Sequence, residues 1–538
     1  MTPRTTAQLP SARYTSADPV AAEGWRVDRL TPPSRLFGAN GLRTGPDGRM
    51  YIAQVTGSQI SALDIATGTI ETISPKGGDI VTPDDLAFDP AGNLYATEYM
   101  EGRVSVRDTA GRTRVLRDDI PAANGITTYH GRLFVNECRE GGRLMEFDLG
   151  GGPPRVLLEN LPSPNAMEVG PDGLLYFPVM TANEIWRVSL DPDGRAEPER
   201  VATDLGVPDS VKFDAEGLIV STQVATGQVL RIDPRTGAKT VLAQLTPGLD
   251  NLTIVDGRLF VSNFTGEITE VLGNGETRTL LPGGFNWPHG LAVGADGRLY
   301  IADGTYFYAL DSDGTREAVA MLFTPGYPGY MRGLAATGDG HFVCTTSLGQ
   351  VGQYRPGAET DYLATGYDQL YGVAVSGDGS VVFAELGAGR VHGLRGASAE
   401  VLADGLGEPS GVAFGPDDVP LIAESSAGRV VRLSRSGVET VVDGLDTPQG
   451  VTVDGGTLYI VDAGAKEILA VDLATGERTA IATGLAIGSP PGVNPKPLRG
   501  IQPFSGPQGP FADITSGPDG TLYVSADGEG SVLAVRRT

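Results

Sequence analysis

The chain has 538 residues, of which 40% are hydrophobic and 20% charged, and these values indicate a globular protein rather than a disordered one. Its 66 acidic and 41 basic residues give a formal net charge of −25, which argues against nucleic acid and anionic membrane surfaces as partners. No apolar run reaches the ~20 residues that a membrane helix needs, so no membrane span is expected.

The chain opens with a polar segment, residues 1–23, that we expect to be flexible and that lacks the apolar core of a signal peptide. The stretch "GWRVDRL" (residues 24–30) follows and is typical of a single outer strand placed before the first repeat. The only two cysteines, Cys138 and Cys344, lie far apart, so we expect no disulfide framework and a location in the reducing cytoplasm.

A hairpin turn followed by an apolar strand recurs twelve times, from "GPDGRMYIAQ" near the start to "GPDGTLYVSA" near the end. Alternation before each turn and β-branched or aromatic runs after it predict strands. The spacing of about 40 residues fits one four-stranded propeller blade. Because known propellers have about four to eight blades, we predict an all-β chain of two consecutive six-bladed β-propellers.

We place the boundary between the propellers near residue 275, which gives one at 24–275 and the other at 276–538. The stretch "ETRTLL" (residues 276–281) would open the second propeller as residues 24–30 open the first. The last repeat stops after its third strand, so it needs a donated strand to cover its edge. A Pro/Gly-rich segment at 486–509 interrupts the regular spacing of the repeats and predicts a long loop over one face of the second propeller.

The two halves differ at one position, the residue that begins each innermost strand, which we call the start residue. In the first half the start residues are Asn40, Asp84, Asn124, Asn165, Asp209 and Asp250. In the second half they are His289, Arg332, Tyr371, Ser410, Gln449 and Ala512. Innermost strands line the channel of a propeller, so each set is expected to converge.

Carboxylates and amides that face one another across a narrow channel repel and lose solvation, and a divalent cation would offset that cost. Oxygen-only ligands favour Ca²⁺ or Mg²⁺, whereas zinc generally prefers nitrogen and sulfur. The alternative is that Asp and Asn only shape turns and cap backbone groups. The second half, however, uses the same turns without Asp or Asn there. We predict a divalent metal, Ca²⁺ first with Mg²⁺, Mn²⁺ or Zn²⁺ as alternatives, held by Asn40, Asn124, Asn165, Asp209 and Asp250.

Two segments, "PNAMEVGPDGLLYFPVMTANEIWRVSLDPDG" (164–194) and "PDSVKFDAEGLIVSTQVATGQVLRIDPRTG" (208–237), resemble the senescence marker protein/gluconolactonase family, also called regucalcin. The likeness covers about residues 35–275, and the second half looks like a related six-bladed propeller. The resemblance implies a channel metal whose Asn, Asn and Asp ligands fall on Asn124, Asn165 and Asp209, with Asp209 also accepting a proton. Asn40 stands where the family has a Glu, and Asp250 would restore the lost charge. The Asp250–Asn251 pair also looks like the paraoxonase calcium site.

A divalent ion can polarise a carbonyl and activate water, and Asp209 or Asp84 could then accept a proton. We therefore predict a metal-dependent hydrolase of a small molecule, a lactonase or esterase. A lyase, cyclase or isomerase of secondary metabolism on the same metal is one alternative, and a non-catalytic binding scaffold is another. The predicted pocket walls follow the second strand of each blade: Glu98, Tyr99, Phe177, Met180, Gln223 and Phe264.

Other catalytic signals are weaker. Cys138, in "FVNECREGG", is either a nucleophile at the pocket mouth or an inert loop thiol. In the second channel His289, Arg332 and Tyr371 could bind an anion or perform acid–base work like that of the propeller streptogramin lyase. We interpret the second propeller as a scaffold or partner surface. The sequence leaves the substrate and the oligomeric state open.

Overall fold

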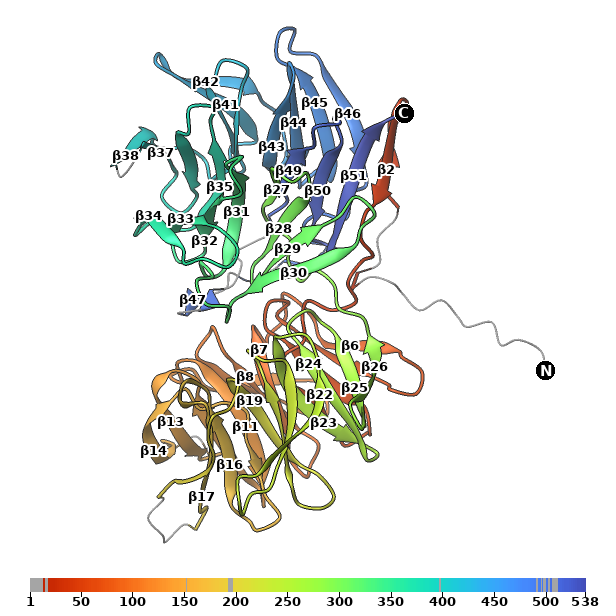
Figure 1. Cartoon of the computed structure of the whole chain (residues 1–538), viewed down its shortest axis with the longest axis vertical. Coiled ribbons are helices and arrows are strands. Elements are labelled where there is room, and N and C mark those ends of the chain that lie inside the picture. The colour runs from red at the N-terminus through yellow and green to blue at the C-terminus, as the bar shows by residue number, and fades with distance from the viewer. Residues whose placement is uncertain are drawn as a thin grey trace, which may run out of the picture. The chain divides into compact units, whose positions relative to one another are not determined.

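The computed structural model describes residues 13–14, 18–150, 152–191, 197–395, 398–489, 492–494, 496, 500–501, 504–505 and 511–538. The protein is all-β and consists of two consecutive six-bladed propellers, as predicted (Figure 1). Within these ranges the single helix is a short 3₁₀ turn, η1 (Met180–Ala182). Over the same ranges, no helix has the length and hydropathy that a membrane span requires.

Each blade of the first propeller is an antiparallel sheet of four strands in chain order, with its first strand innermost. Its six blades are β3 (Leu42–Thr44), β4 (Met50–Gln54), β5 (Gln59–Leu63), β6 (Ile70–Ser74); β7 (Pro83–Phe88), β8 (Leu94–Glu98), β9 (Arg103–Arg107), β10 (Thr113–Arg117); β11 (Ala123–Tyr129), β12 (Arg132–Glu137), β13 (Glu140–Phe147), β14 (Arg155–Pro162); β15 (Glu168–Val169), β16 (Leu175–Val179), β17 (Glu184–Val188), β18 (Glu199–Ala202); β19 (Pro208–Phe213), β20 (Ile219–Gln223), β21 (Gln228–Ile232), β22 (Lys239–Gln244); and β23 (Leu249–Val255), β24 (Arg258–Asn263), β25 (Ile268–Gly273), β26 (Glu276–Leu281).

The second propeller repeats this plan in five blades, and N-terminal strands join the last two blades: β1 adds a fifth strand to the fifth blade, and β2 is the fourth strand of the sixth. Its six blades are β27 (Leu291–Val293), β28 (Leu299–Asp303), β29 (Tyr306–Leu310), β30 (Arg316–Met321); β31 (Met331–Ala336), β32 (Phe342–Thr346), β33 (Gln350–Tyr354), β34 (Asp361–Thr365); β35 (Leu370–Val375), β36 (Val381–Glu385), β37 (Arg390–Arg395), β38 (Ser398–Ala403); β39 (Pro409–Phe414), β40 (Pro420–Glu424), β41 (Arg429–Ser434), β42 (Gly437–Val442); β43 (Pro448–Asp454), β44 (Thr457–Asp462), β45 (Glu467–Asp472), β46 (Arg478–Thr483), β1 (Val20–Ala21); and β49 (Ile514–Ser516), β50 (Leu522–Ala526), β51 (Ser531–Arg537), β2 (Trp25–Arg29).

The innermost strands form two closed rings. In the first propeller each of β3, β7, β11, β15, β19 and β23 contacts the next, and β23 contacts β3. In the second propeller β27, β31, β35, β39, β43 and β49 close in the same way. The core lies between the faces of neighbouring blades, where apolar side chains of adjacent sheets, such as Ile60 and Leu94, pack together.

The N-terminal strand belongs to the second propeller, which corrects the expected domain boundaries. Strand β2 pairs with β51 along five residues and hides its edge, as Figure 1 shows. The stretch 276–281 is β26, the outer strand of the first propeller's last blade, so this propeller needs no donated strand. Over the described residues, one compact unit therefore contains Arg35–Gly284, and the other contains Ala12–Ser34, Phe285–Val493 and Gly500–Thr538.

Two predicted segments lie partly outside the described residues. Of the segment 1–23, residues 1–12 and 15–17 are not described, and Val20–Ala21 form β1, which pairs with β46. Half of the predicted loop at 486–509 also lies outside the described residues, but within it β47 (Gly500–Ile501) pairs with β48 (Phe504–Ser505). The two cysteines are buried and do not form a disulfide.

Candidate functional site

The start residues of the first propeller lie where its inner strands begin, and in four blades this point is a β-bulge. The pairing between the first and second strands shifts around Asp84, Asn124, Asp209 and Asp250. A bulge sets two residues opposite one and re-aims their side chains, which is why bulges are common beside active sites.

Polar residues of the second strands hold these bulges in place. The backbone N–H groups of Asp85, Gly125 and Asn251 donate to Thr97, Asn136 and Ser262 at 3.0 Å each. Two of these side chains also reach the next blade, because Asn136 Nδ2 donates to the Asn165 carbonyl and Ser262 Oγ to the Asn40 carbonyl, both at 2.7 Å. These two hydrogen bonds fix the start of the fourth blade to the third and the start of the first blade to the last.

Two Asn–Asp pairs form between start residues. Asn165 Nδ2 donates to Asp209 Oδ2 at 2.8 Å, and Asn40 Nδ2 donates to Asp250 Oδ2 at 2.9 Å. The amide oxygens accept from backbone N–H groups, Asn165 Oδ1 from Ala166 at 2.7 Å and Asn40 Oδ1 from Val55 at 3.1 Å. Both amides therefore turn their nitrogens toward a carboxylate and help to orient it.

Three buried or half-buried carboxylates repel one another in this channel. Burial, followed by the charges of Asp84 and Asp85, raises the pKa of Asp209 well above its usual value. Burial and the charge of Asp209 do the same to the pKa of Asp250, and burial with Asp250 to that of Asp84. A cation among these groups would relieve the repulsion.

Asn124 supplies the clearest unoccupied ligand atom for a metal ion, its side-chain oxygen. Its side chain is 5% exposed, and its Oδ1 has no hydrogen-bond partner among the described residues. Buried polar atoms nearly always have a hydrogen-bond partner, since a buried polar atom without one costs about 1–3 kcal/mol. An unpaired carbonyl oxygen in a channel with two buried carboxylates fits the donor set of a hard divalent cation.

The acids alone do not make a metal site. Across the described residues, no three His, Cys, Asp or Glu side chains are arranged to hold a metal ion. A cation held by Asp209 and Asp250 would therefore draw its other protein ligands from amides, first from Asn124 Oδ1.

Two sulfur atoms lie on one side of the acids. Cys138 Sγ lies 3.6 Å from Met180 Sδ, and Asn165 Nδ2 lies 3.0 Å from the same Met180 sulfur. Tyr99 Oη donates to the Cys138 carbonyl at 3.4 Å. Burial and then the charge of Asp209 raise the pKa of Cys138 well above its usual value, which favours an inert thiol over a thiolate nucleophile.

Tyr99 and Met180 thus lie near the acids, whereas the other predicted wall residues make contacts within a blade or between neighbouring blades. Glu98 accepts from the Val81 N–H at 2.6 Å and pairs with Arg103. Gln223 accepts from the Gly206 N–H at 2.9 Å. Phe177 packs in a core cluster, and Phe264 is half-buried and donates its N–H to the Gly248 carbonyl.

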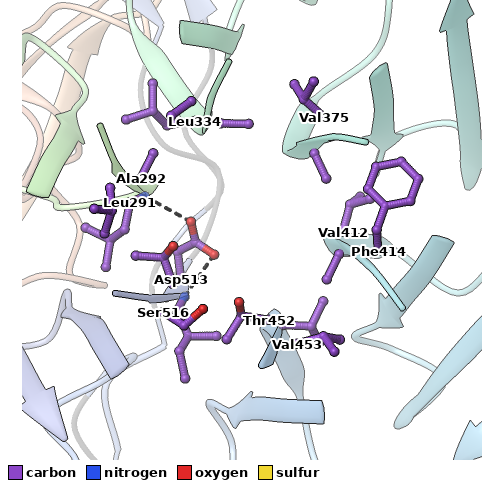
Figure 2. A pocket seen from close by; sticks show the side chains of 18 residues that line it. Leu291, Ala292, Leu334, Val375, Val412, Phe414, Thr452, Val453, Asp513 and Ser516 are labelled. Atoms are coloured by element: carbon purple, nitrogen blue, oxygen red, sulfur yellow. Dashed lines mark hydrogen bonds between the residues drawn. The ribbon is translucent and has the colours of Figure 1, made fainter. Parts of the chain in front are cut away.

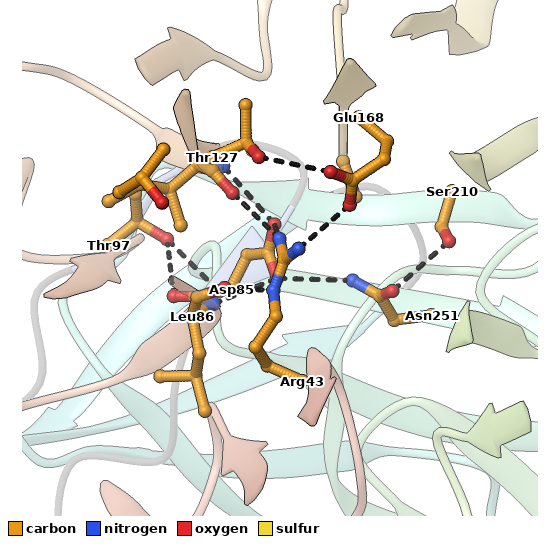
Figure 3. A network of polar contacts seen from close by, with 12 residues as sticks. Arg43, Asp85, Leu86, Thr97, Thr127, Glu168, Ser210 and Asn251 are labelled. Atoms are coloured by element: carbon orange, nitrogen blue, oxygen red, sulfur yellow. Dashed lines mark hydrogen bonds and ion pairs between the residues drawn. The ribbon is translucent and has the colours of Figure 1, made fainter. Parts of the chain in front are cut away.

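A second polar layer, which we call the channel network, lies further along the inner strands (Figure 3). Arg43 Nη1 donates to Glu168 at 2.8 Å, and Lys212 Nζ lies 2.9 Å from the same carboxylate. Arg43 also donates to the carbonyls of Leu86 and Ile126, so it reaches from the first blade to the second, third and fourth.

The channel network was not predicted, although the sequence contains a signal for it. Arg43, Glu168 and Lys212 each follow a start residue by three positions, which is where an inner strand next points inward. Asp85 joins the network by accepting from the Ile126 N–H at 3.2 Å and from Asn251 Nδ2 at 3.3 Å.

In the second propeller the three predicted channel residues are buried and gather around an aromatic ring that was not predicted. The Arg332 guanidinium lies 4.7 Å from the centre of the Tyr371 ring. Phe511 lies 4.8 Å from Tyr371 and 6.0 Å from His289, measured between ring centres. Phe511 directly precedes the start residue Ala512. It was not predicted because only start residues were expected to line the channel.

Comparisons with known proteins match two parts of the chain. A family model described as the SMP-30/gluconolactonase/LRE-like region matches residues 26–255, and an NHL repeat matches residues 285–306. No curated protein matches the chain.

Two solved structures are similar to part of the chain. A streptogramin B lyase is 18% identical, with a TM-score of 0.39, and the match covers 52% of this chain and 94% of that one. A gluconolactonase from Xanthomonas campestris is 15% identical, with a TM-score of 0.39, and the match covers 47% of this chain and 97% of that one. The family match is confined to residues 26–255, and over this part the N-terminal half of the chain is similar to the SMP-30/gluconolactonase/LRE-like region.

Proposed function

We propose that the first propeller is a divalent-metal-dependent hydrolase that opens a lactone or a similar small ester. The observation that carries the proposal is the unpaired, buried Asn124 Oδ1 in a channel where Asp209 and Asp250 repel each other. The gluconolactonase-like character of residues 26–255 supports hydrolysis as the reaction.

The residues divide into ligands, orienting groups and a proton acceptor. Asp209, Asp250 and Asn124 Oδ1 would hold the cation, preferably Ca²⁺, which when bound polarises a carbonyl and acidifies water. Asn165 and Asn40 keep the two carboxylates in position through their Nδ2 hydrogen bonds.

Asp84 is the candidate general base. It is half-buried, and burial together with the charge of Asp250 raises its pKa well above the usual value, which makes it a stronger proton acceptor than an ordinary carboxylate. Asp209, the acceptor that the family resemblance implies, is already engaged by Asn165 Nδ2.

The proposal is tested by acid release from a panel of five- and six-membered lactones. We expect the chelator-treated protein to be inactive and added Ca²⁺ to restore hydrolysis. Asp84→Asn should lower kcat about 100-fold or more while Ca²⁺ binding persists, as loss of a general base does. Asp256→Asn, at an exposed hairpin turn of the last blade, is the matched control and should behave as the wild type.

Two results would contradict this function. Hydrolysis that survives chelation would exclude the metal from the mechanism. A protein that binds Ca²⁺ but opens none of the lactones would favour the lyase, cyclase or isomerase alternative, and a protein with no metal and no activity would favour a binding scaffold.

A further inference from the structure

The channel of the second propeller contains a cavity of about 290 Å³ (Figure 2). All six inner strands contribute to its walls, with residues one to four positions after the start residue. The cavity therefore lies further along the inner strands than the start residues His289, Arg332 and Tyr371, which do not line it. It lies entirely within the second propeller.

The cavity exists because small residues replace large charged ones at equivalent positions. Three residues after the start residue, the first propeller has Arg43, Glu168 and Lys212, which form the channel network. At this offset the second propeller has only alanine and threonine: Ala292, Ala335, Ala374, Ala413, Thr452 and Thr515.

The ring of inner strands cannot contract to fill the space. A Cβ atom at Gly333 would lie 2.2 Å from the Tyr371 carbonyl oxygen, and one at Gly372 would lie 2.3 Å from that of Ser410. The backbones of neighbouring blades are therefore already in contact, and the short side chains leave an opening between them.

The walls of the cavity are amphipathic. Figure 2 shows Asp513, Ser516 and Thr452 on one side and Val412 and Phe414 on another. Asp513 is the only titratable residue among those that line the cavity in the described part of the chain.

Asp513 is held rigidly and retains acceptor capacity. Its two oxygens accept from the N–H groups of Leu291 at 3.0 Å and Ile514 at 2.9 Å, and its own N–H donates to Ser525 Oγ at 2.7 Å. Each carboxylate oxygen has a second lone pair that a ligand can use. Burial, opposed by these backbone hydrogen bonds, raises the pKa of Asp513 to about 7, so a cationic partner would stabilise its charge.

We propose that this cavity binds a small organic ammonium ion whose nitrogen pairs with Asp513 and whose apolar part packs against Val412 and Phe414. A concave site that combines apolar side chains with a few polar groups is typical of small-molecule sites, and here the negative charge of Asp513 selects a cation. The proposal is independent of the hydrolase assigned to the first propeller.

Titration calorimetry of the full chain tests the proposal with 2-phenylethylammonium chloride and its neutral analogue 2-phenylethanol. We expect the ammonium ion to bind at least about tenfold more tightly than the alcohol, a difference of about 1.4 kcal/mol. Asp513→Asn should remove this preference. Ala374→Leu fills the cavity without changing Asp513 and should weaken binding of both compounds, whereas Ala358→Leu, at an exposed turn, should not.

Thermal denaturation of each variant establishes that it folds, and Ala374→Leu serves as the second test because Asp513→Asn also loses a backbone hydrogen bond. Equal affinity for the ammonium ion and the alcohol would overturn the proposal. So would ammonium binding that is unchanged in folded Ala374→Leu, or no binding by the wild type at millimolar concentration.

Discussion

Glu168 is the acceptor that two cations of the channel network share, the buried Lys212 and the half-buried Arg43. Its carboxylate lies 2.8 Å from Arg43 Nη1 and 2.9 Å from Lys212 Nζ. Burial disfavours its charge, but Lys212 and Arg43 outweigh that effect and lower its pKa to about 2. The ionised form of Glu168 is therefore part of the folded structure.

Glu168→Gln should lower the free energy of unfolding at pH 7 by about 3 kcal/mol, because the buried Lys212 and the half-buried Arg43 lose their counter-charge. Urea denaturation measures the loss. Glu199→Gln is the control, since this glutamate also pairs with an arginine but its side chain is 64% exposed, and its loss should stay within about 1 kcal/mol.

The wild type and Glu168→Gln also allow a test of pH dependence. A lowered pKa means that the stability from Glu168 is complete above its unfolded pKa of about 4.5 and is lost as the pH falls toward 2. The difference between wild type and Glu168→Gln should therefore shrink over that interval. A difference that is constant down to pH 2 would show that the charge of Glu168 is not what stabilises the fold.

At the residue scale, the sequence could indicate which side chains meet but not how they are oriented. The pattern of start residues predicts a cluster of oxygens, and the structure brings Asn40 to Asp250 and Asn165 to Asp209. Which end of each amide faces the carboxylate depends on the backbone N–H groups of Val55 and Ala166, which local patterns do not reveal.

At the scale of single strands, glycine after the start residue sets the spacing of the second propeller's blades. Gly290, Gly333, Gly372, Gly411 and Gly450 share this position. A Cβ atom at any of them would lie between 2.1 and 2.7 Å from the carbonyl oxygen of the next start residue. These glycines are therefore required by close packing of neighbouring backbones.

Gly333→Ala should destabilise the second propeller by at least about 2 kcal/mol, because the added methyl group would overlap the Tyr371 carbonyl and force the blades apart. Gly377→Ala, in a turn where a Cβ would meet nothing within 4 Å, should change stability by less than about 0.5 kcal/mol. Thermal denaturation of both variants measures this. Equal melting temperatures would mean that the inner ring can widen without cost.

Strand pairing shows the limit of local sequence patterns. Residues 24–30 and 276–281 both have the character of an outer strand, and the final repeat plainly lacks one. Which of them closes which ring depends on contacts between distant parts of the chain, such as the ion pair between Arg29 and Glu529 at 2.8 Å. The existence of the strands was predictable, whereas their partners were not.

At the scale of the whole molecule, the chain contributes β2 to the second propeller before it builds the first. Removing residues 1–30 would expose the edge strands β51 and β46 and leave Glu529, which is buried, without Arg29. We expect calorimetry to show a lower melting temperature for the second propeller and an unchanged transition for the first. If both transitions shift together, or neither shifts, then β2 does not close the second ring alone.

The architecture was the most predictable feature, because a turn repeated about every 40 residues already implies blades and rings. The cavity of the second propeller was not predictable, since alanine and threonine at one offset become an opening only when the blades cannot approach one another.

Calcium titration of the chelator-treated full chain tests the central claim most directly. We predict that the wild type binds about one Ca²⁺, that Asp250→Asn and Asn124→Ala each weaken binding at least about tenfold, and that Asp256→Asn binds as the wild type does. If the wild type binds no Ca²⁺, or if Asp250→Asn and Asn124→Ala bind it as well as the wild type, the channel of the first propeller is not a metal site.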